Sequence, residues 1–429
     1  RKARKNNGAK RDMHYEMEQE EHDVYPDDPD FDINKARLVT TAPRICVRYE
    51  CVPMRFIKHV YKIHTYAQDG CLFEGKTPVS AFLNSSYDGS FIAGLMELRY
   101  IQSLPVERII NYFESHGFTL KKPTAHKLME KASSLFENLY KCIRQTALSD
   151  PYKAADETYY KILVPEKNSK GKGVRKGYLW VVVGINTRMI YLLYDDGSRS
   201  EKVILNELGG CKGIIQSDGY SPYRKLESDA YPHITRIPCL QHIKRKFIDC
   251  GEDDPDAKRI VEMINTLYQN EHKHKIGVDG WTVEQNLVHR KKYAPDILGE
   301  IKDVLDDIEE RGDLLPKSEL KEAITYLRNE WNAVVDIFNY GDTYLDNNIV
   351  ERMNRYISLS RKNSLFFGSH KGAERGAILY TIALTCRMNK VNLFEYLTDI
   401  INRTAEWQPN TPLEKYRQLL PDRWEKAND

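Results

Sequence analysis

The fold class is decided by two apolar stretches, LWVVVG at 179–184 and MIYLLY at 189–194, which are separated by a short connection. Both stretches are rich in β-branched and aromatic residues, and this composition favours strands. Because the apolar residues are continuous rather than alternating, we expect both strands to be covered on their two faces. Such strands belong to the interior of a layered sheet.

Downstream segments extend this sheet. A helix-length segment at 201–208 is followed by a strand over 211–218 that ends in Asp218, and a further strand covers 234–240. The alternation of strands with a helix predicts a mixed α/β layer over residues 150–250.

All-helical segments precede and interrupt this layer. Three helices are predicted within 85–148, the third of them running from about residue 123 through 139. Three apolar stripes with helical spacing fall within 251–340, and two further helices are expected at 346–358 and at about 371–388. The sequence therefore predicts a mixed α/β core that contains an all-helical insertion.

The remaining boundaries follow from charge and strand patterns. Blocks of like charge at 1–40 repel each other and rarely fold, whereas Ile57 and Val60 continue a strand-like pattern. The predicted parts are a charged segment expected to be disordered at 1–40, a β-rich segment at 41–80, a helical domain at 85–148, the first part of the core at 150–250, the helical insertion at 251–340, the second part of the core at 341–395, and a C-terminal tail at 396–429.

A short turn at 117–120 joins the second and third helices of the 85–148 segment, which is the spacing of a helix-turn-helix. The start of the third helix is basic and contains Lys121, Lys122 and Lys127. We interpret it as a candidate recognition helix for DNA. An ordinary helical hairpin with a solvated basic face is the alternative interpretation.

Overall charge does not decide the partner, because 64 Lys and Arg nearly balance 62 Asp and Glu, for a net charge of +2. A nucleic-acid enzyme needs a local basic surface rather than a basic total. No apolar run approaches the roughly 18 residues of a membrane span, and no signal peptide is recognisable. We therefore expect no membrane partner and a cytoplasmic protein.

The eight cysteines are scattered and form no C-x-x-C pair, which predicts reduced and mostly buried thiols. Cys46, Cys51 and Cys71 lack the paired spacing of a structural zinc site. Cys239 and His242 form only half of such a site, so zinc is not expected there either.

Three acids stand out from the others by their positions. Asp156 opens the α/β region, Asp218 ends an apolar strand, and Glu351 lies one turn into a late helix. Two metal ions about 3.5–4 Å apart need shared carboxylates to offset their mutual repulsion. Taken alone, however, an Asp before Gly is usually a turn residue, and a helical Glu is usually solvated. The hypothesis of a metal site therefore depends on the three acids as a set.

Several motifs occur in the same order as in insertion sequence 66 (IS66) family transposases, of the DDE (Asp-Asp-Glu) class, which the chain resembles from about residue 12 to its end. The motifs are DET at 156–158, GYLW at 177–180, QSDGY at 216–220, CLQHIKRKF at 239–247, DNNIVER at 346–352, SRKN at 360–363 and LLP at 419–421. One departure concerns residues 25–75, where the paired cysteines of the family's zinc-binding segment are missing.

The resemblance implies an RNase H-like core and a transposase that cleaves DNA and transfers 3′-OH ends. It places the family's three acids on Asp156, Asp218 and Glu351, with Glu157 as a weaker candidate. The implied cofactor is a pair of Mg²⁺ ions, for which Mn²⁺ substitutes. The implied partners are transposon and target DNA, a second copy of the chain and accessory proteins of the same element, in the bacterial cytoplasm at the nucleoid.

Two basic clusters lie close in sequence to these acids, and we expect them to contact DNA phosphates. They comprise Lys244, Arg245 and Lys246 in the first cluster, and Arg352, Arg355, Arg361 and Lys362 in the second. Cys239 and His242 are expected to support the site, His242 by a hydrogen bond to a phosphate or an acid.

Two other functions use the same residues differently. An RNase H-like nuclease would cleave DNA without strand transfer, whereas an inactive, domesticated protein would only bind DNA. The presence of all three acids argues against an inactive protein, and the altered cysteine region is the observation in its favour.

Overall fold

The computed structural model describes residues 54–60, 62, 64–68, 71–74, 81–82, 85–167, 171, 173–408 and 410–426. The chain divides into two compact units, Arg1–Met54 and Arg55–Asp429, and the following description concerns the second. The charged segment predicted at 1–40 lies outside the described residues, as do Cys46 and Cys51.

The β-rich segment predicted at 41–80 contains a single described hairpin. Strands β1 (Thr65–Gln68) and β2 (Cys71–Glu74) pair antiparallel. The strand predicted through Ile57 and Val60 is wrong, because residues 54–60 have no regular secondary structure. Both side chains are exposed, at 59% and 69%, so neither has the buried face that makes an alternating strand stable.

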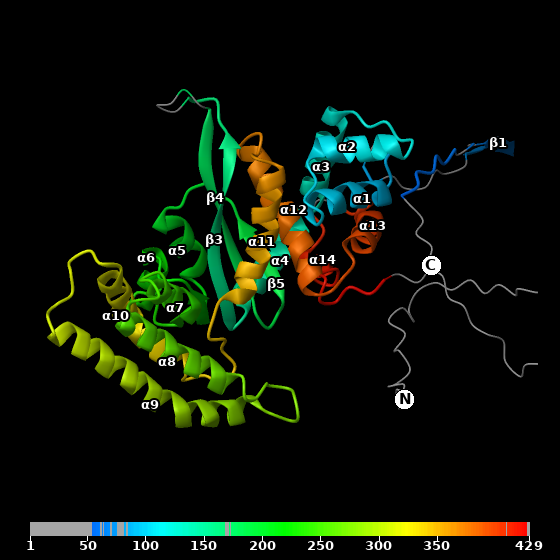
Figure 1. Cartoon of the computed structure of the whole chain (residues 1–429). Coiled ribbons are helices and arrows are strands. Elements are labelled where there is room, and N and C mark those ends of the chain that lie inside the picture. The colour runs from blue at the N-terminus through cyan, green and yellow to red at the C-terminus, as the bar shows by residue number, and fades with distance from the viewer. Residues whose placement is uncertain are drawn as a thin grey trace, which may run out of the picture. The chain divides into compact units, whose positions relative to one another are not determined.

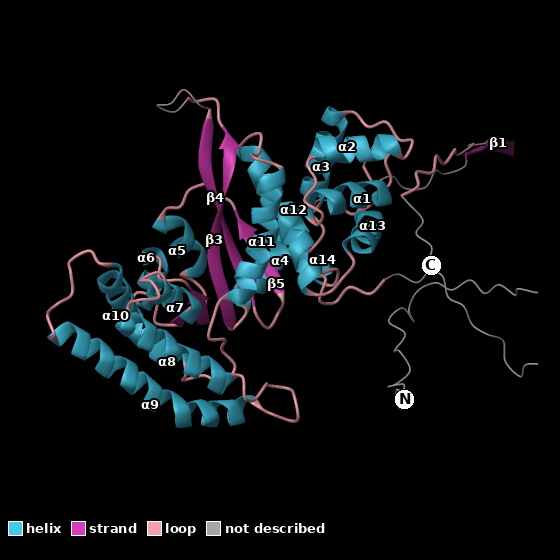
Figure 2. Cartoon of the chain, viewed as in Figure 1, coloured by secondary structure: helices cyan, strands magenta, loops and turns pink. Residues whose placement is uncertain are grey.

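A five-stranded mixed sheet forms the core, in the order β5-β4-β3-β6-β7 (Figure 2). Strands β3, β4 and β5 form an antiparallel meander, and β6 and β7 run parallel to β3. The strands are β3 (Tyr152–Leu163), β4 (Val174–Gly184), β5 (Met189–Leu193), β6 (Gly213–Ser217) and β7 (Ile234–Pro238). The predicted mixed α/β layer is thereby confirmed.

The two strands predicted from their apolar sequence are buried as expected. Residues 179–184 of β4 and 189–192 of β5 are all buried. The free edge of β5 is closed by helix α12, because the amides of Ile190 and Leu192 donate to the hydroxyls of Thr385 and Thr381. This cover satisfies backbone groups that an exposed edge strand would leave unpaired.

Helices cover both faces of the sheet (Figure 1). One side carries α4 (Glu137–Ser149), α11 (Asn348–Asn363) and α12 (His370–Met388); the other carries α5 (Glu201–Leu208), α6 (Ser221–Arg224) and α7 (Leu240–Ile248). The predicted helices at 201–208, 346–358 and 371–388 correspond to α5, α11 and α12.

The predicted third helix of the 85–148 segment is two helices in the structure. Four helices occur here: α1 (Gly89–Tyr100), α2 (Val106–Ser115), α3 (Lys122–Leu135) and α4. The break falls at Phe136, whose φ of −92° and ψ of 3° depart from helical values. It redirects the chain, so that α4 packs against β5 while α3 contacts α1 and α12.

The C-terminal segment predicted as a tail at 396–429 packs against the N-terminal helices. Helix α13 (Leu393–Thr404) contacts α1, and the short α14 (Leu413–Arg417) contacts α4. Buried Tyr396, Leu397 and Ile400 supply the apolar face of α13. The two ends of the described chain therefore contribute to one helical layer beside the sheet.

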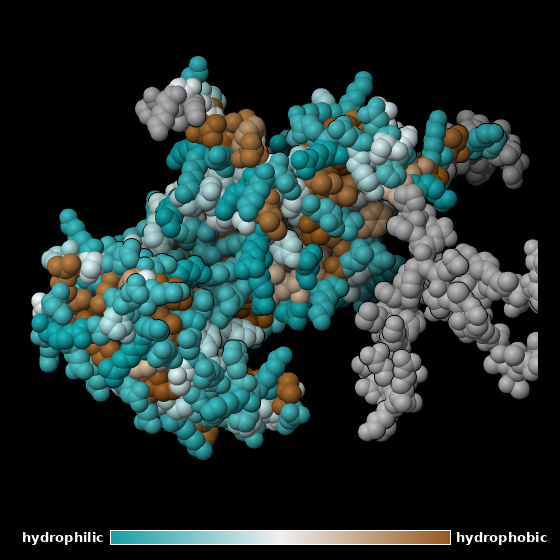
Figure 3. Space-filling view, in the orientation of Figure 1, coloured by the Kyte–Doolittle hydropathy of each residue, from teal (hydrophilic) through white to brown (hydrophobic). Residues whose placement is uncertain are grey.

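The helical insertion is built from α8 (Pro255–Glu271), α9 (Val283–Glu310) and α10 (Glu319–Ile337). Its apolar side chains share a core with β6, β7 and α7 through residues such as Leu267, Leu305, Ile237 and Phe247. The insertion is thus packed on the sheet layer, and its visible surface is mainly hydrophilic with scattered apolar residues (Figure 3). Among the described helices, none has the length and apolar character needed to span a membrane.

Candidate active site

Asp156 and Asp218 lie at the same level of two neighbouring parallel strands. The register pairs Ala154 of β3 with Gln216 of β6, and each acid comes two residues later. Asp218 directly follows the end of β6, so the edge of β3 beside Asp156 has no neighbouring strand there. Burial raises the pKa of Asp156 to about 8, and the negative charges of Glu157 and Asp218 contribute to the same rise.

Helix α11 lies against this open edge of β3. Asn354 donates from Nδ2 to Oδ2 of Asp156 at 2.7 Å, and Asn347 donates from Nδ2 to the carbonyl of Ala155 at 3.0 Å. Glu351 precedes Asn354 by three residues and therefore lies on the same face of the helix. The helix thus turns Glu351 toward the side of the sheet that carries Asp156.

Glu351 is grouped most closely with two residues of the β7–α7 segment. Its Oε1 lies 3.6 Å from Nε2 of His242, and the ligand atoms of Cys239, His242 and Glu351 all lie within 4.8 Å of one another. Within the described residues, Asp156 and Asp218 do not belong to this close group. Oε1 of Glu351 and Nδ1 of His242 are buried without a hydrogen-bond partner in the part of the chain that the structure describes.

Cys239 has the surroundings of a neutral thiol. Burial raises its pKa to about 11, and its Sγ accepts a hydrogen bond from the amide of Asn347 at 3.3 Å. Metal ligation requires the thiolate instead. The hydrogen bond ties the residue that follows β7 to the residue that precedes α11.

His242 links Glu351 to a cavity that Asp218 lines. The cavity has a volume of about 370 Å³, and its lining includes Asp218, His242, Arg245 and Lys246. Two members of the first predicted basic cluster are therefore brought beside an acid. The third, Lys244, is half-buried and does not line the cavity.

The second basic cluster divides into residues that face outward and one that is engaged with the sheet. Arg355 and Lys362 are exposed on α11, and Arg352 is exposed as well. Arg361 instead donates from Nη1 to Oγ1 of Thr158 at 3.0 Å and to the carbonyl of the next residue at 2.8 Å. Arg361 therefore fastens α11 to β3.

The predicted recognition helix corresponds to α3, which packs against α1 and α12. Lys121 precedes α3, Lys122 forms an ion pair with Glu107 of α2, and Lys127 is exposed. Residues 116–121 separate α2 from α3. This connection is longer than the three to four residues usual in a helix-turn-helix.

The turn after β6 is held by buried residues that the sequence reasoning missed. Arg236 of β7 is 2% exposed; it donates to Oγ of Ser217 at 3.0 Å and to the carbonyl of Asp218 at 2.7 Å. Its guanidinium also pairs with Glu330 of α10 at 2.5 Å. From the same helix, the hydroxyl of Tyr326 accepts a hydrogen bond from the amide of Gly219 at 2.8 Å. The sequence signal that could have indicated this role is Arg236 itself, a charged residue within the apolar stretch of β7.

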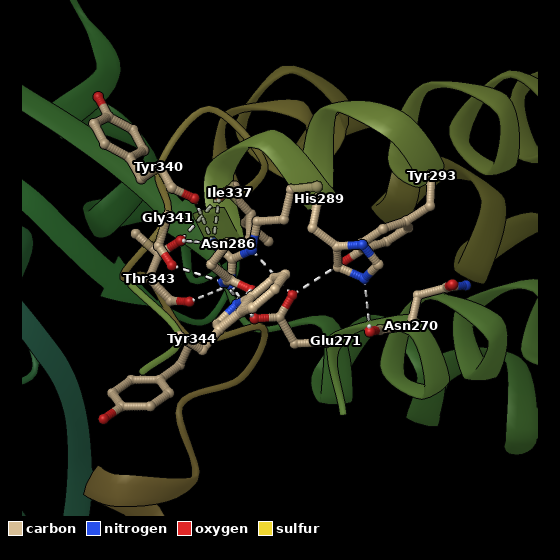
Figure 4. Close-up of polar contacts among 12 residues, drawn as sticks. Asn270, Glu271, Asn286, His289, Tyr293, Ile337, Tyr340, Gly341, Thr343 and Tyr344 are labelled. Atoms are coloured by element: carbon tan, nitrogen blue, oxygen red, sulfur yellow. Dashed lines mark hydrogen bonds and ion pairs between the residues drawn. The ribbon is translucent and has the colours of Figure 1, made fainter. Parts of the chain in front are cut away.

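The segment that leads from the insertion into α11 is held by Arg290 of α9. Figure 4 shows several of its partners side by side, among them Glu271, Tyr340 and Thr343. This side chain is fully buried and donates to the carbonyls of Ile337, Tyr340 and Thr343. It also forms a bidentate ion pair with Glu271 of α8.

On the sheet side, the hydroxyl of Tyr152 accepts a hydrogen bond from the amide of Tyr344 at 2.9 Å, and Gln216 donates to the carbonyl of the same residue at 2.8 Å. The approach to Glu351 is thus fixed from both the insertion and the sheet.

Fold and site together define a mixed α/β protein with Asp156 in the central strand β3 and Asp218 directly after the neighbouring parallel strand β6. The chain belongs to the transposase IS66 family, whose model matches residues 84–375, more than half of its length. The resemblance seen in the sequence motifs is thereby confirmed.

Three relatives come from Sinorhizobium fredii (strain NBRC 101917 / NGR234). The uncharacterized protein y4jD is 25% identical over 77% of this chain and 65% of its own length. The uncharacterized protein y4hP is 24% identical over 92% of this chain and 76% of its own length. The uncharacterized protein y4qI is 26% identical over 86% of this chain and 69% of its own length. The chain thus spans slightly less than two thirds of y4jD.

Proposed function

We propose that the chain is a DDE transposase with an RNase H-like core, which cleaves DNA strands and transfers their 3′-OH ends. The observation that carries the proposal is the placement of Asp156 and Asp218 at one level of β3 and β6, beside the helix that presents Glu351. The strand order supports the RNase H-like assignment, because an antiparallel meander is continued by two strands parallel to its first.

The three acids fit a pair of hard divalent cations, Mg²⁺ or Mn²⁺, which prefer carboxylate oxygens. Oε1 of Glu351 is buried and has no hydrogen-bond partner among the described residues, so it is available as a ligand. The electrostatic coupling of three carboxyl groups, those of Asp156, Glu157 and Asp218, is the second feature that favours a cation. When bound, two such ions activate the attacking oxygen and stabilise the leaving oxygen.

The protein's own residues orient the acids and the DNA. Asn354 fixes the Asp156 carboxylate, and Arg236 fixes the backbone of Asp218. Arg245 and Lys246 line the cavity beside Asp218, where a phosphate of the substrate must lie, and we propose that they bind it. Because two transposon ends must be held together, we propose that at least two copies of the chain act together, with accessory proteins of the same element.

Substitution of the three acids tests the proposal. Asp156→Asn, Asp218→Asn and Glu351→Gln are each expected to abolish Mg²⁺-dependent cleavage of labelled transposon-end DNA, because each removes a charged ligand. Folding and DNA binding should be retained. Glu300→Gln, on an exposed position of α9, is the matched control and should cleave normally. Cleavage by the Asp218 variant would refute the assignment.

The alternative functions are separated by a further assay. A nuclease without transferase activity would cleave labelled ends but would never join them to target DNA. An inactive, domesticated DNA-binding protein would bind the ends and do neither. Joined products that depend on all three acids are therefore the result that the proposal requires.

A further inference from the structure

Cations and aromatic rings alternate in an unbroken series on this protein. The guanidinium of Arg361 lies 4.0 Å from the ring centre of Tyr159, and Nζ of Lys176 lies 4.3 Å from the same ring and 5.2 Å from that of Tyr178. The guanidinium of Arg199 lies 5.1 Å from the ring of Tyr178 and 4.1 Å from the ring of Tyr220. We call these six residues the cation–tyrosine track.

The track is assembled from segments far apart in the sequence. Tyr159 and Tyr178 are direct partners in the β3–β4 register, so their rings share one face of the long strand pair seen in Figure 1. Arg361 comes from α11, Arg199 from the loop before α5, and Tyr220 from the turn after β6.

One end of the track lies next to a candidate acid. Tyr220 follows Asp218 by two residues, and its amide donates to Oδ1 of that acid at 3.1 Å. Toward the other end, Tyr159 shares its face of β3 with Glu157, the neighbour of Asp156. In between, Arg199 forms an ion pair with Glu157.

Charge and exposure leave the track open to an anionic, aromatic ligand. Lys176 and Arg199 are exposed, and the three tyrosines are half-buried. In the part of the chain that the structure describes, neither Lys176 nor Arg361 forms an ion pair with a carboxylate, so only Arg199 has an acidic partner. The track therefore contains three cationic side chains, and one of them is paired with an acid.

We propose that the cation–tyrosine track binds an unpaired DNA strand and leads it into the acid site. The phosphates of the DNA strand bind the cationic side chains. Its bases stack on the tyrosine rings, which Lys and Arg side chains cover in the free protein. A duplex keeps its base faces stacked inside and offers the track only phosphates. The inference rests on the proposed function and adds to it that DNA at this site is single-stranded next to the scissile bond.

Binding of labelled oligonucleotides of about 20 nucleotides tests the proposal, with the full chain and without divalent cations. Replacing Tyr159 and Tyr178 by Ala is expected to weaken binding of the single strand by about tenfold or more per ring. Binding of the matching duplex should change little. Tyr178→Phe keeps the ring and should bind like the native chain.

Two further variants separate the track from general effects. Lys176→Gln should reduce the salt dependence for the single strand by about 0.7 in slope, because one phosphate is no longer neutralised by the protein. Tyr356→Ala disrupts another cation–aromatic pair, with Arg387 at 4.3 Å, and should leave single-strand binding unchanged. The thermal unfolding of each variant identifies any that fail to fold, in which case Lys176→Gln decides the matter.

Equal losses for single strand and duplex would overturn the proposal, as would unchanged single-strand binding in both the tyrosine and lysine variants. A chain that cleaves DNA but shows no effect of the track would contradict this inference alone. A chain that prefers single strands through the track but never cleaves would instead contradict the proposed function.

Discussion

Replacing Arg290 by Met should destabilise the insertion and release the segment that leads to Glu351. Met keeps much of the apolar stem but removes every donor from a fully buried position. Three carbonyls are left without this donor, at Ile337, Tyr340 and Thr343, and the Glu271 carboxylate is left without its bidentate cation.

The magnitude follows from the burial of this pair. Breaking a buried ion pair by removing one partner costs about 3–5 kcal/mol. Glu271 is only 18% exposed and keeps hydrogen bonds from Asn286 and Tyr293, so we expect a loss of about 3 kcal/mol, at the lower end of that range. Such a loss is a large part of the roughly 5–15 kcal/mol of a typical domain.

Denaturant unfolding followed by tryptophan fluorescence measures the effect, since Trp281 and Trp331 lie in the insertion. Hydrogen exchange should also accelerate between residues 337 and 347 while the amides of β4 stay protected. Adding Glu271→Gln to Arg290→Met should recover part of the stability, because the uncompensated buried charge is removed. Lys292→Met, an exposed position on the same helix, is the control. A loss below about 1 kcal/mol with unchanged exchange would refute the reasoning.

Two predictions concern the charged groups of the site. Burial raises the pKa of Asp156 from its ordinary value of 3.8 to about 8, so ionisation of Asp156 destabilises the metal-free fold increasingly as the pH rises through this interval. Asp156→Asn should therefore melt at a higher temperature than the native chain at about pH 9, with an advantage that disappears toward about pH 4; a lower melting temperature at the higher pH would contradict the burial argument. Replacing Arg245 and Lys246 by Ala should lower the salt slope of duplex binding by about 0.9 for each phosphate that the protein no longer neutralises, and an unchanged slope in a salt titration would exclude both residues as phosphate ligands.

The sequence was most informative where apolar burial alone determines the structure. The run at 179–184 lies in β4, the run at 189–194 covers β5 and one further residue, and the acid expected at the end of a strand directly follows β6. Strand β3 was harder to define, because polar residues such as Lys153, Asp156 and Glu157 interrupt its apolar pattern. It is a strand because β4 pairs with it along its whole length, and such pairing is not readable from β3 itself.

The polar residues that hold the site could not be assigned because their partners are distant in sequence. Arg236 contacts Glu330 across 94 residues, and Asn354 contacts Asp156 across 198. Local periodicity reports which face of an element is buried but not which polar group it meets. The position of Asn354 on the same helical face as Glu351 was the one local hint.

The helical insertion is connected to both halves of the candidate site. Through Glu330 and Tyr326, helix α10 holds the turn that carries Asp218, and through Arg290, helix α9 holds the approach to Glu351. Catalytic geometry fails when supporting groups leave a side chain about 1 Å out of place. An insertion that only extended the surface would not need Arg236 and Arg290 buried against the segments that carry these acids. The insertion is therefore a part of the scaffold that sets the distance between Asp218 and Glu351.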